Sequence, residues 1–246
     1  MNQTKPLVSV LLPVYNGQEF LSEALQSVLS QKYGNLEVIA VDDDSKDHSV
    51  RVLKKFKESD NRLRIYRNKN HYGLNISLNR ALSKARGQFI AFMPQDGRNY
   101  VERIGKQVSF LLKNPSFGAV GTQVSFTKSN KVVSRSSFPI NPSDIEKNLI
   151  GNALDFETFM INKLSLPRDI LRFGQEEHPF LFSALFMKII KYSTIANLEH
   201  VLIFKRLGSE ENKTSNIELF MKNIRMFINS FFVHEYRPSI RSLFSL

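Results

Sequence analysis

Cysteine and tryptophan are both absent from this chain of 246 residues. Without a thiol the protein can form no disulfide bond, no thiolate zinc site and no cysteine nucleophile. Apolar residues also form no run that approaches the ~18 residues of a membrane-spanning helix. The segment 1–6 lacks the basic start and the apolar stretch of a secretory signal. We therefore expect a protein that is soluble or peripheral at a membrane surface.

Acidic residues are scarce relative to basic ones, with 23 Asp and Glu against 34 Lys and Arg. The resulting formal charge of +11 favours an anionic partner. Nucleic acid is the weaker interpretation, because the sequence has no zinc-finger spacing, no aromatic RNA-binding signature and no single basic run. A phosphorylated substrate or an acidic membrane surface fits the charge better. The length suits one large domain or two small ones.

The first half of the chain alternates strand-like apolar runs with amphipathic patterns of helical spacing. The strand-like runs are 7–14, 36–41, 63–66 and 89–93. Between the first two, Asn16 with Glu19 predicts a capping box at the start of a helix. Strict alternation implies right-handed βαβ units and a parallel sheet covered by helices on both faces. Ligands of such sheets gather beyond the carboxyl ends of the strands.

The second half of the chain has less regular patterns. It predicts a helix around 101–112, a strand at 118–126, a hairpin or loop at 127–137, a helix at 180–192 and a strand at 195–204. The stretch 217–232 has one apolar face, with Lys222 and Arg225 off it. Such a helix either packs on its own domain or lies in a membrane interface, with its basic residues near acidic headgroups.

Three consecutive acids, Asp42, Asp43 and Asp44, follow the second strand-like run. Adjacent carboxylates repel one another, so their placement needs a compensating partner. One interpretation is structural, with Asp44 or Ser45 capping the next helix near its positive end. The other is a ligand whose donors, such as a pyrimidine N–H and ribose hydroxyls, meet the acids. Both remain open, and each can hold for different members of the run.

Asp96 is a single acid presented at the end of the fourth strand-like run, just before Gly97. An Asp-Gly pair is commonly no more than a turn. The alternative is a ligand of Mg²⁺ or Mn²⁺, since such cations bind few carboxylates together with water and phosphate oxygens.

Several segments of the chain resemble the family 2 glycosyltransferases. The opening block reads Val-Ser-Val-Leu-Leu-Pro-Val-Tyr-Asn at 8–16, and the next reads Val-Asp-Asp-Asp-Ser-Lys-Asp at 41–47. Further blocks follow in the order of the family, at 70–82, 85–92, 102–108 and 118–121. Several ordered blocks over about half the chain are far more specific than a lone motif. The resemblance implies an α/β fold of the GT-A-like (Rossmann-like) kind, a mostly parallel sheet flanked by helices.

The resemblance also implies an activity and a set of site residues. The activity is inverting transfer of a sugar from a nucleoside-diphosphate sugar, most often a UDP form, to a glycan or lipid-linked acceptor. Pro13 and Tyr15 would line the nucleobase pocket, and Asp43, with Asp42 beside it, would accept hydrogen bonds from base and ribose. Asp96 falls on the last acid of the family's Asp-x-Asp and would hold Mg²⁺ or Mn²⁺ against the diphosphate.

Two departures from the family bear on catalysis. Pro94 replaces the first acid of Asp-x-Asp, and Gly97 replaces the acid that usually follows it. Leu181 and Phe182 stand at the acidic pair whose Asp is the family's general base, and neither can accept a proton. Glu177 is the catalytic candidate that remains in this region, since a shifted loop could bring its carboxylate to the acceptor.

Other interpretations of this region stay open. His178 could replace the base because its pKa lies near neutrality, and Asp155 and Glu157 are further candidates. The segment 175–178 could equally be a solvated loop. The main rival function is therefore a pseudo-glycosyltransferase, a nucleotide-sugar-binding or scaffold module that has lost its base. A dinucleotide-dependent oxidoreductase is disfavoured because the first strand–helix turn lacks Gly-x-Gly-x-x-Gly.

The expected organisation is one GT-A-like domain at 1–210 and a C-terminal amphipathic helical extension at 211–246. Within the domain, about 5–115 would bind the nucleotide sugar and about 116–210 the acceptor. The resemblance further implies a role in cell-envelope polysaccharide biosynthesis. We expect a cytoplasmic protein, either free or peripheral at the inner face of the cell membrane.

Overall fold

The computed structural model describes residues 5–129, 131–147, 149, 154–174 and 180–207. The strands are β1 (Val8–Val14), β2 (Leu36–Asp42), β3 (Leu63–Arg67), β4 (Phe89–Phe92), β5 (Arg98–Asn99), β6 (Phe117–Lys128), β7 (Lys131–Arg135), β8 (Met160–Asn162) and β9 (Thr194–Arg206). The helices are α1 (Leu21–Leu29), α2 (Ser49–Ser59), α3 (Leu74–Lys84), α4 (Arg103–Lys113), α5 (Pro142–Lys147) and α6 (Phe180–Ile189), with short 3-10 turns η1 (Phe156–Thr158) and η2 (Lys163–Ser165).

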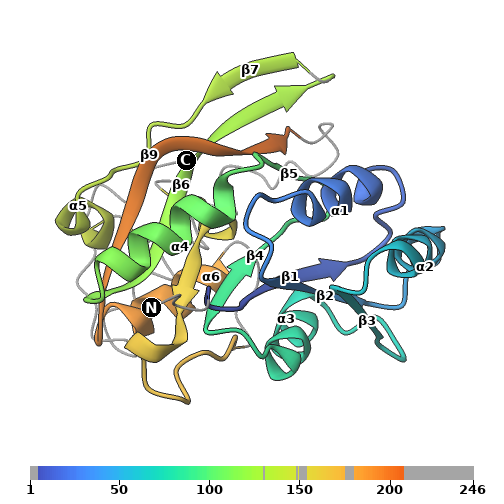
Figure 1. Ribbon diagram of the computed structural model, residues 1–246, viewed down its shortest axis with the longest axis horizontal. Helices are drawn as coiled ribbons and strands as arrows, with labels where there is room; N and C mark the ends of the chain where they lie inside the picture. The colour runs from blue at the N-terminus through green and yellow to red at the C-terminus, as the bar shows by residue number, and fades with distance from the viewer. Residues whose placement is uncertain (1–4, 130, 148, 150–153, 175–179, 208–246) are drawn as a thin grey trace, which may run out of the picture.

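The strands form one mixed sheet in the order β3-β2-β1-β4-β8-β6-β9-β5, and β7 pairs with β6 (Figure 1). β1 pairs in parallel with β2 and β4, and β2 in parallel with β3. β8 runs antiparallel to β4, with Met160 opposite Ala91 and Asn162 opposite Phe89. The residues that precede β8 therefore lie at the carboxyl ends of the parallel strands. The predicted fold class, an α/β sheet flanked by helices, is confirmed, with the parallel pairings confined to β1–β4 and to β6 with β9.

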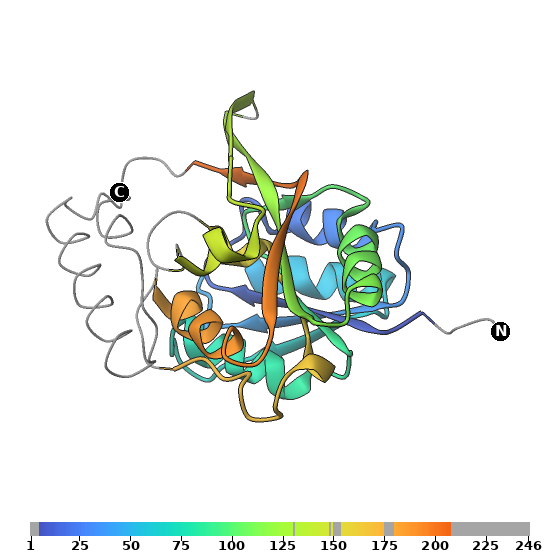
Figure 2. The same ribbon diagram turned by 90° about the vertical axis from the view of Figure 1, so that its left-hand side faces the viewer.

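Helices cover both faces of the sheet because successive strand residues point to opposite sides. Val10, Leu12 and Val38 belong to a buried cluster with α1, α2 and α4, whereas Leu11 and Ile39 belong to a second cluster with α3 and α6. Seen from the side, α3 and α6 lie below the central strands and α1 and α4 above them (Figure 2). Burial of each such leucine, isoleucine or valine contributes about 1.5–3 kcal/mol to the hydrophobic free energy of folding.

The start of α1 differs from the sequence prediction. Asn16 does not cap this helix: it has a φ of 47°, and its side-chain oxygen accepts a hydrogen bond from the Lys46 N–H at 2.9 Å. The Gly17 carbonyl instead accepts hydrogen bonds from the N–H groups of Phe20 and Leu21. The predicted capping box is therefore wrong, because Asn16 connects the β1 and β2 loops instead.

The start of α2 bears on the structural interpretation of the acid run. Neither Asp44 nor Ser45 caps this helix: the Ser45 hydroxyl accepts a hydrogen bond from the Asn16 N–H, and Asp44 has a φ of 62°. Asp47, three residues beyond Asp44, accepts from the Ser49 N–H at 2.9 Å instead. The capping interpretation was thus wrong for the two residues to which it was applied.

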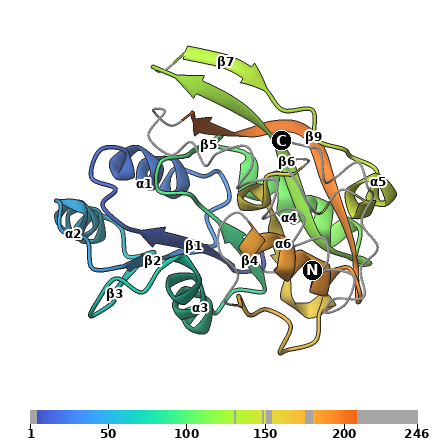
Figure 3. The ribbon, with the colours of Figure 1, turned by 180° about the vertical axis from the view of Figure 1, so that it is seen from behind.

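The second half confirms most of the expected elements. The polar stretch at 127–137 is part of the β6–β7 hairpin, which projects from the edge of the sheet (Figure 3). The helix expected at 180–192 is α6, and the strand expected at 195–204 is β9. The stretches 175–179 and 211–246, which include Glu177, His178 and the predicted C-terminal helix, lie outside the described residues. In the part of the chain that is described, no helix is long and apolar enough to span a membrane.

Arg103 is a fully buried cation at the start of α4. Its guanidinium donates hydrogen bonds to the Phe92 carbonyl at 3.0 Å, the Asn99 side-chain oxygen at 2.8 Å and the Thr158 carbonyl at 3.0 Å. Burial lowers the pKa of Arg103 to about 9, although the Asp155 and Glu157 carboxylates oppose the shift. The group is therefore protonated at neutral pH and ties the end of β4 to the segment before β8.

Replacement of this cation tests its structural role. Arg103→Met should lower the free energy of unfolding by about 3 kcal/mol or more, because it leaves several buried carbonyl groups without donors. Chemical denaturation with urea measures the loss. Lys113→Met, an exposed position on the same helix, is the matched control and should change stability little. Equal midpoints for the two variants would contradict the assigned role.

Candidate functional site

A pocket of about 280 Å³ opens at the carboxyl ends of β1, β2 and β4. The residues that line it come from the ends of these strands, from the loop into α3, from the first turn of α3 and from η1. They are Pro13, Val14, Tyr15, Asp43, His71, Leu74, Ser77, Pro94, Gln95, Asp96 and Glu157. The structure therefore brings together five residues singled out from the sequence, Pro13, Tyr15, Asp43, Asp96 and the outlying base candidate Glu157. This is the place where ligands bind in open α/β sheets.

Tyr15 forms an aromatic wall of the pocket and is 40% exposed. The His71 imidazole stacks on its ring, with centroids 3.9 Å apart and planes 21° apart. A flat ring therefore already lies against Tyr15, on a surface suited to a heterocyclic base. A base that stacks there either displaces His71 or uses the other face of the tyrosine.

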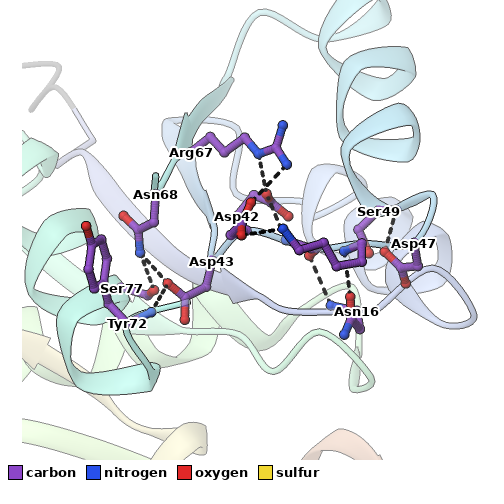
Figure 4. A network of polar contacts seen from close by, with 12 residues as sticks. Asn16, Asp42, Asp43, Asp47, Ser49, Arg67, Asn68, Tyr72 and Ser77 are labelled. Carbon is purple, nitrogen blue, oxygen red and sulfur yellow. Dashed lines mark hydrogen bonds and ion pairs between the residues drawn. The ribbon is translucent and has the colours of Figure 1, made fainter. Parts of the chain in front are cut away.

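Asp43 is held in place by the loop that leads into α3 (Figure 4). Its carboxylate accepts hydrogen bonds from the Asn68 amide at 2.5 Å, the Tyr72 N–H at 3.1 Å and the Gly73 N–H at 2.7 Å. The His71 Nδ1 lies 2.8 Å from it. Burial alone would raise the pKa of Asp43, but these hydrogen bonds outweigh it and lower the pKa below its usual value. The carboxylate is thus ionised and fixed in orientation.

The other two acids of the run share Arg67, and each also has a partner of its own. Asp42 is fully buried, and its carboxylate lies 3.2 Å from Arg67 Nε and accepts a hydrogen bond from the Ser45 N–H at 3.3 Å. Asp44 pairs with Lys46 at 2.5 Å and with Arg67 at 3.2 Å. Neither acid is among the described residues that line the pocket. Asp42 and Asp43 thus point to different donors (Figure 4), and Arg67 together with Lys46 compensates the charge of Asp44.

The turn that carries Asp96 is fixed from two sides. The Gln95 side chain binds the Tyr15 backbone twice, accepting from its N–H at 2.9 Å and donating to its carbonyl at 2.9 Å. Arg206 donates to the Asp96 carbonyl at 2.6 Å, pairs with Glu23 at 2.7 Å and lies over the ring of Phe20. These contacts hold the Asp96 side chain in the same pocket as Asp43.

The chain that forms this pocket matches a known protein family. Residues 9–170 match the profile of Glycosyl transferase family 2. This chain belongs to that family. The sequence resemblance is thereby confirmed, on a match that covers both Asp43 and Asp96.

Two curated relatives show how far the likeness extends. An uncharacterized glycosyltransferase of Haemophilus influenzae is 25% identical over 249 residues, which cover 97% of this chain and 93% of that protein. WfgD of Escherichia coli, named UDP-Glc:alpha-D-GlcNAc-diphosphoundecaprenol beta-1,3-glucosyltransferase, is 37% identical over 108 residues, which cover 44% of this chain and 42% of that protein. For WfgD and for several other curated relatives, the chain therefore spans less than half of the relative's length.

Two solved structures share the fold. Staphylococcus aureus TarS 1–349 in complex with UDP-GlcNAc has a TM-score of 0.71 and 19% identity, covering 90% of this chain and 66% of that one. The mannosyltransferase PcManGT of Pyrobaculum calidifontis, in complex with GDP-Man and Mn²⁺, has a TM-score of 0.68 and 20% identity, covering 90% and 65%. At these identities the likeness shows a common GT-A-like architecture.

The pocket offers few ligands to a cation. Among the described residues, no group of three or more His, Asp and Glu side chains is arranged to hold a metal. Asp96 is the acid expected for this role, and Glu157 lines the same pocket. Mg²⁺ and Mn²⁺ accept one or two carboxylates when phosphate oxygens and water complete the shell. The donor set therefore suits a cation that arrives with a diphosphate.

The position that the sequence resemblance assigns to the family's general base lies in the protein core. Leu181 and Phe182 at the start of α6 are 1% and 4% exposed. The Phe182 ring meets Phe92 edge-on at 5.2 Å and Phe173 at 5.3 Å. A carboxylate at this point would lie among aromatic rings without a partner. The sequence prediction that this pair cannot accept a proton agrees with its place in the structure.

Glu157 lines the pocket from η1 and is bound to a lysine. Lys205 Nζ on β9 lies 2.6 Å from its carboxylate and 2.9 Å from that of Asp155. Burial opposes the charge on Lys205, but the two carboxylates outweigh this and raise the pKa of the ammonium. For Asp155, burial is the larger effect and raises its pKa despite Lys205. The three groups form one compact ionic cluster at the edge of the pocket.

Sequence reasoning did not assign His71 or Gln95 to the site. Both occupy loops beyond strand ends, where ligand-facing residues of this fold gather. His71 lies within a block that resembles the family, and Gln95 is the residue before Asp96. Their positions alone could have identified them as candidates. The stacking of His71 on Tyr15 and the two hydrogen bonds of Gln95 to the Tyr15 backbone, however, depend on how the loops fold.

The contacts of Asp43 predict a pH-dependent contribution to stability. Its pKa is lowered in the folded state, so its contribution is present above the unfolded pKa of ~3.9 and is lost as the pH falls through the folded value. Asp43→Asn should lower the free energy of unfolding by about 1–3 kcal/mol at pH 7. The difference from the wild type should shrink below pH ~4.

Urea denaturation of both proteins at a series of pH values measures this difference. The exposed Asp169→Asn is the control and should change stability little at either end of the series. A difference between Asp43→Asn and the wild type that stays constant with pH would contradict the account of this carboxylate.

Proposed function

We propose that the protein transfers a sugar from a nucleoside-diphosphate sugar to a hydroxyl of a glycan or a lipid-linked acceptor, with inversion and with the help of a divalent cation. The observation that carries this proposal is the presence of Asp43 and Asp96 in one pocket with Tyr15. That pocket lies at the strand ends of a chain that belongs to the matching family. One bound nucleotide can contact Tyr15, Asp43 and Asp96 at the same time only if the three side chains converge. All three line this pocket.

In this proposal, different side chains bind different parts of the donor. Pro13 and Tyr15 hold the base, Tyr15 by stacking, and Asp43 accepts hydrogen bonds from base and ribose. The predicted help of Asp42 is indirect, because its carboxylate fixes the loop through Ser45 and Arg67. Asp96 would hold the cation, whose charge would stabilise the departing nucleoside diphosphate. The acceptor oxygen then attacks the anomeric carbon from the side opposite the leaving group.

A uridine donor is the form that we propose. WfgD is named for UDP-Glc, and TarS was solved with UDP-GlcNAc. PcManGT was solved with GDP-Man, so the fold itself also accommodates guanosine nucleotides. The lipid-linked acceptor in the name of WfgD and the formal charge of +11 support an anionic acceptor and peripheral contact with the inner face of the membrane.

A second candidate function is a nucleotide-sugar-binding module without catalysis. The observation that favours it is the burial of Phe182 against Phe92 and Phe173, at the place where the family carries its base. This candidate and the enzyme share the donor pocket, so they differ in turnover and not in binding.

Nucleotide binding tests the donor site. In a thermal-unfolding series with UDP, ADP and GDP, UDP with Mn²⁺ should stabilise the protein by ~2.7 kcal/mol at a concentration a hundredfold above its Kd. For a chain of this length the shift in Tm is ~5–10 °C. The shift should require Mn²⁺ and should be lost in Asp43→Ala and in Asp96→Ala.

Asp44→Ala is the matched control, because Asp44 belongs to the same acid run and pairs with Lys46 and Arg67 instead of lining the pocket. It should keep the UDP shift. A shift that is equal in Asp43→Ala and wild-type protein, or that needs no Mn²⁺, would count against the proposed donor site.

A further inference from the structure

Three carboxylates stand among the described residues that line the pocket, those of Asp43, Asp96 and Glu157. The Asp43 carboxylate accepts hydrogen bonds from the Asn68 amide and from the Gly73 N–H in the loop into α3. Asp96 is the proposed cation ligand. Glu157 has no part in donor binding as proposed. It is also the one of the three that does not come from the end of a parallel strand, since it belongs to η1.

The topology explains why this side chain reaches the pocket. η1 comes just before β8, and β8 runs antiparallel to β4, so η1 lies at the carboxyl end of β4. Arg103 fixes the segment there by donating to the backbone carbonyls of Glu157 at 3.2 Å and Thr158 at 3.0 Å. The same guanidinium binds the Phe92 carbonyl at the end of β4, four residues before Asp96. Arg103 therefore fixes the backbone beside both Glu157 and Asp96.

The Glu157 carboxylate shares its ammonium partner with a second acid. Lys205 contacts the Glu157 carboxylate through Oε2 and also pairs with Asp155. When Glu157 takes up a proton, Lys205 still lies 2.9 Å from the Asp155 carboxylate, so its ammonium keeps an acidic partner. Lys205 on β9 and Asp155 beside η1 face this carboxylate directly, and Asp96 shares the pocket with it.

We propose that Glu157 is the general base of the transfer reaction, in place of the acid that Phe182 has replaced. This inference rests on the proposed function. Glu157 accepts the proton of the acceptor hydroxyl while the acceptor oxygen forms its bond to the anomeric carbon. The bond from that carbon to the β-phosphate oxygen breaks at the same time, and the nucleoside diphosphate leaves with the electron pair. The proton on Glu157 then passes to solvent.

The test measures UDP release from UDP-GlcNAc and from UDP-glucose with Mn²⁺, with water as the acceptor. Glu157→Gln should lower kcat by ~10²- to 10⁴-fold, the usual contribution of a general base. The KM for the donor and the UDP-induced thermal shift should stay near wild-type values. In the wild type kcat should rise with pH as the base ionises, and this limb should be absent from Glu157→Gln.

A purely structural role for the ion pairs predicts a different pattern. Glu157→Asp keeps the charge but withdraws the carboxylate by one methylene, and it should lower kcat by ~10- to 100-fold while it retains the UDP shift. Asp155→Asn removes the other acid from Lys205, and it should keep the pH-dependent limb even if it unfolds more readily. Glu58→Gln, an exposed position on α2, is the control for the amide substitution.

Two results would overturn the assignment, and they can be told apart. If the wild type releases UDP and either Glu157 variant matches its kcat, the base is not Glu157 and the transfer function stands. If the wild type binds UDP with Mn²⁺ but releases none from either donor, in water or with added glycan acceptors, the transfer function fails and the base fails with it.

Discussion

Carboxylates that gather at one edge of a sheet must each be met by donors, and this requirement shapes the site. Asp42, Asp43 and Asp44 are adjacent in sequence, yet Arg67 pairs with Asp42 and Asp44, Lys46 pairs with Asp44, and the loop into α3 binds Asp43. Without these partners the three charges would repel one another and the end of β2 would be unstable. The arrangement leaves Asp43 ionised, oriented and at the edge of the pocket.

Basic side chains connect this edge to the second half of the chain. Arg103 joins the end of β4 to η1 through backbone carbonyls, and Lys205 on β9 joins Asp155 to Glu157. Arg206, the next residue, holds the turn of Asp96 through its carbonyl. Three basic side chains from α4 and β9 therefore set the geometry of a pocket whose ligand-facing groups come largely from the first half.

The parts of the fold that could be predicted are those that local patterns determine. The alternation of apolar strands with amphipathic helices through the first half predicted β1 to β4 and their parallel pairing, and hence the meeting of Asp43 and Asp96. β8 was missed because three residues carry no periodicity, and its antiparallel direction places Glu157. The start of α2 was misassigned because Asp44 and Asp47 are equally suited by type to accept a hydrogen bond there, and the structure uses Asp47. The stacking of His71 on Tyr15 depends on loop packing, which no spacing encodes.

A crystal structure of the protein with UDP and Mn²⁺ tests the central claim most directly, because it places the ligand relative to both acids. The account predicts the uracil ring against Tyr15, with Asp43 accepting a hydrogen bond from the base or ribose. It also predicts an anomalous signal of the metal at ~2.0–2.2 Å from an Asp96 oxygen, together with diphosphate oxygens. A nucleotide bound outside this pocket, or a metal that is not coordinated by Asp96, would contradict the account.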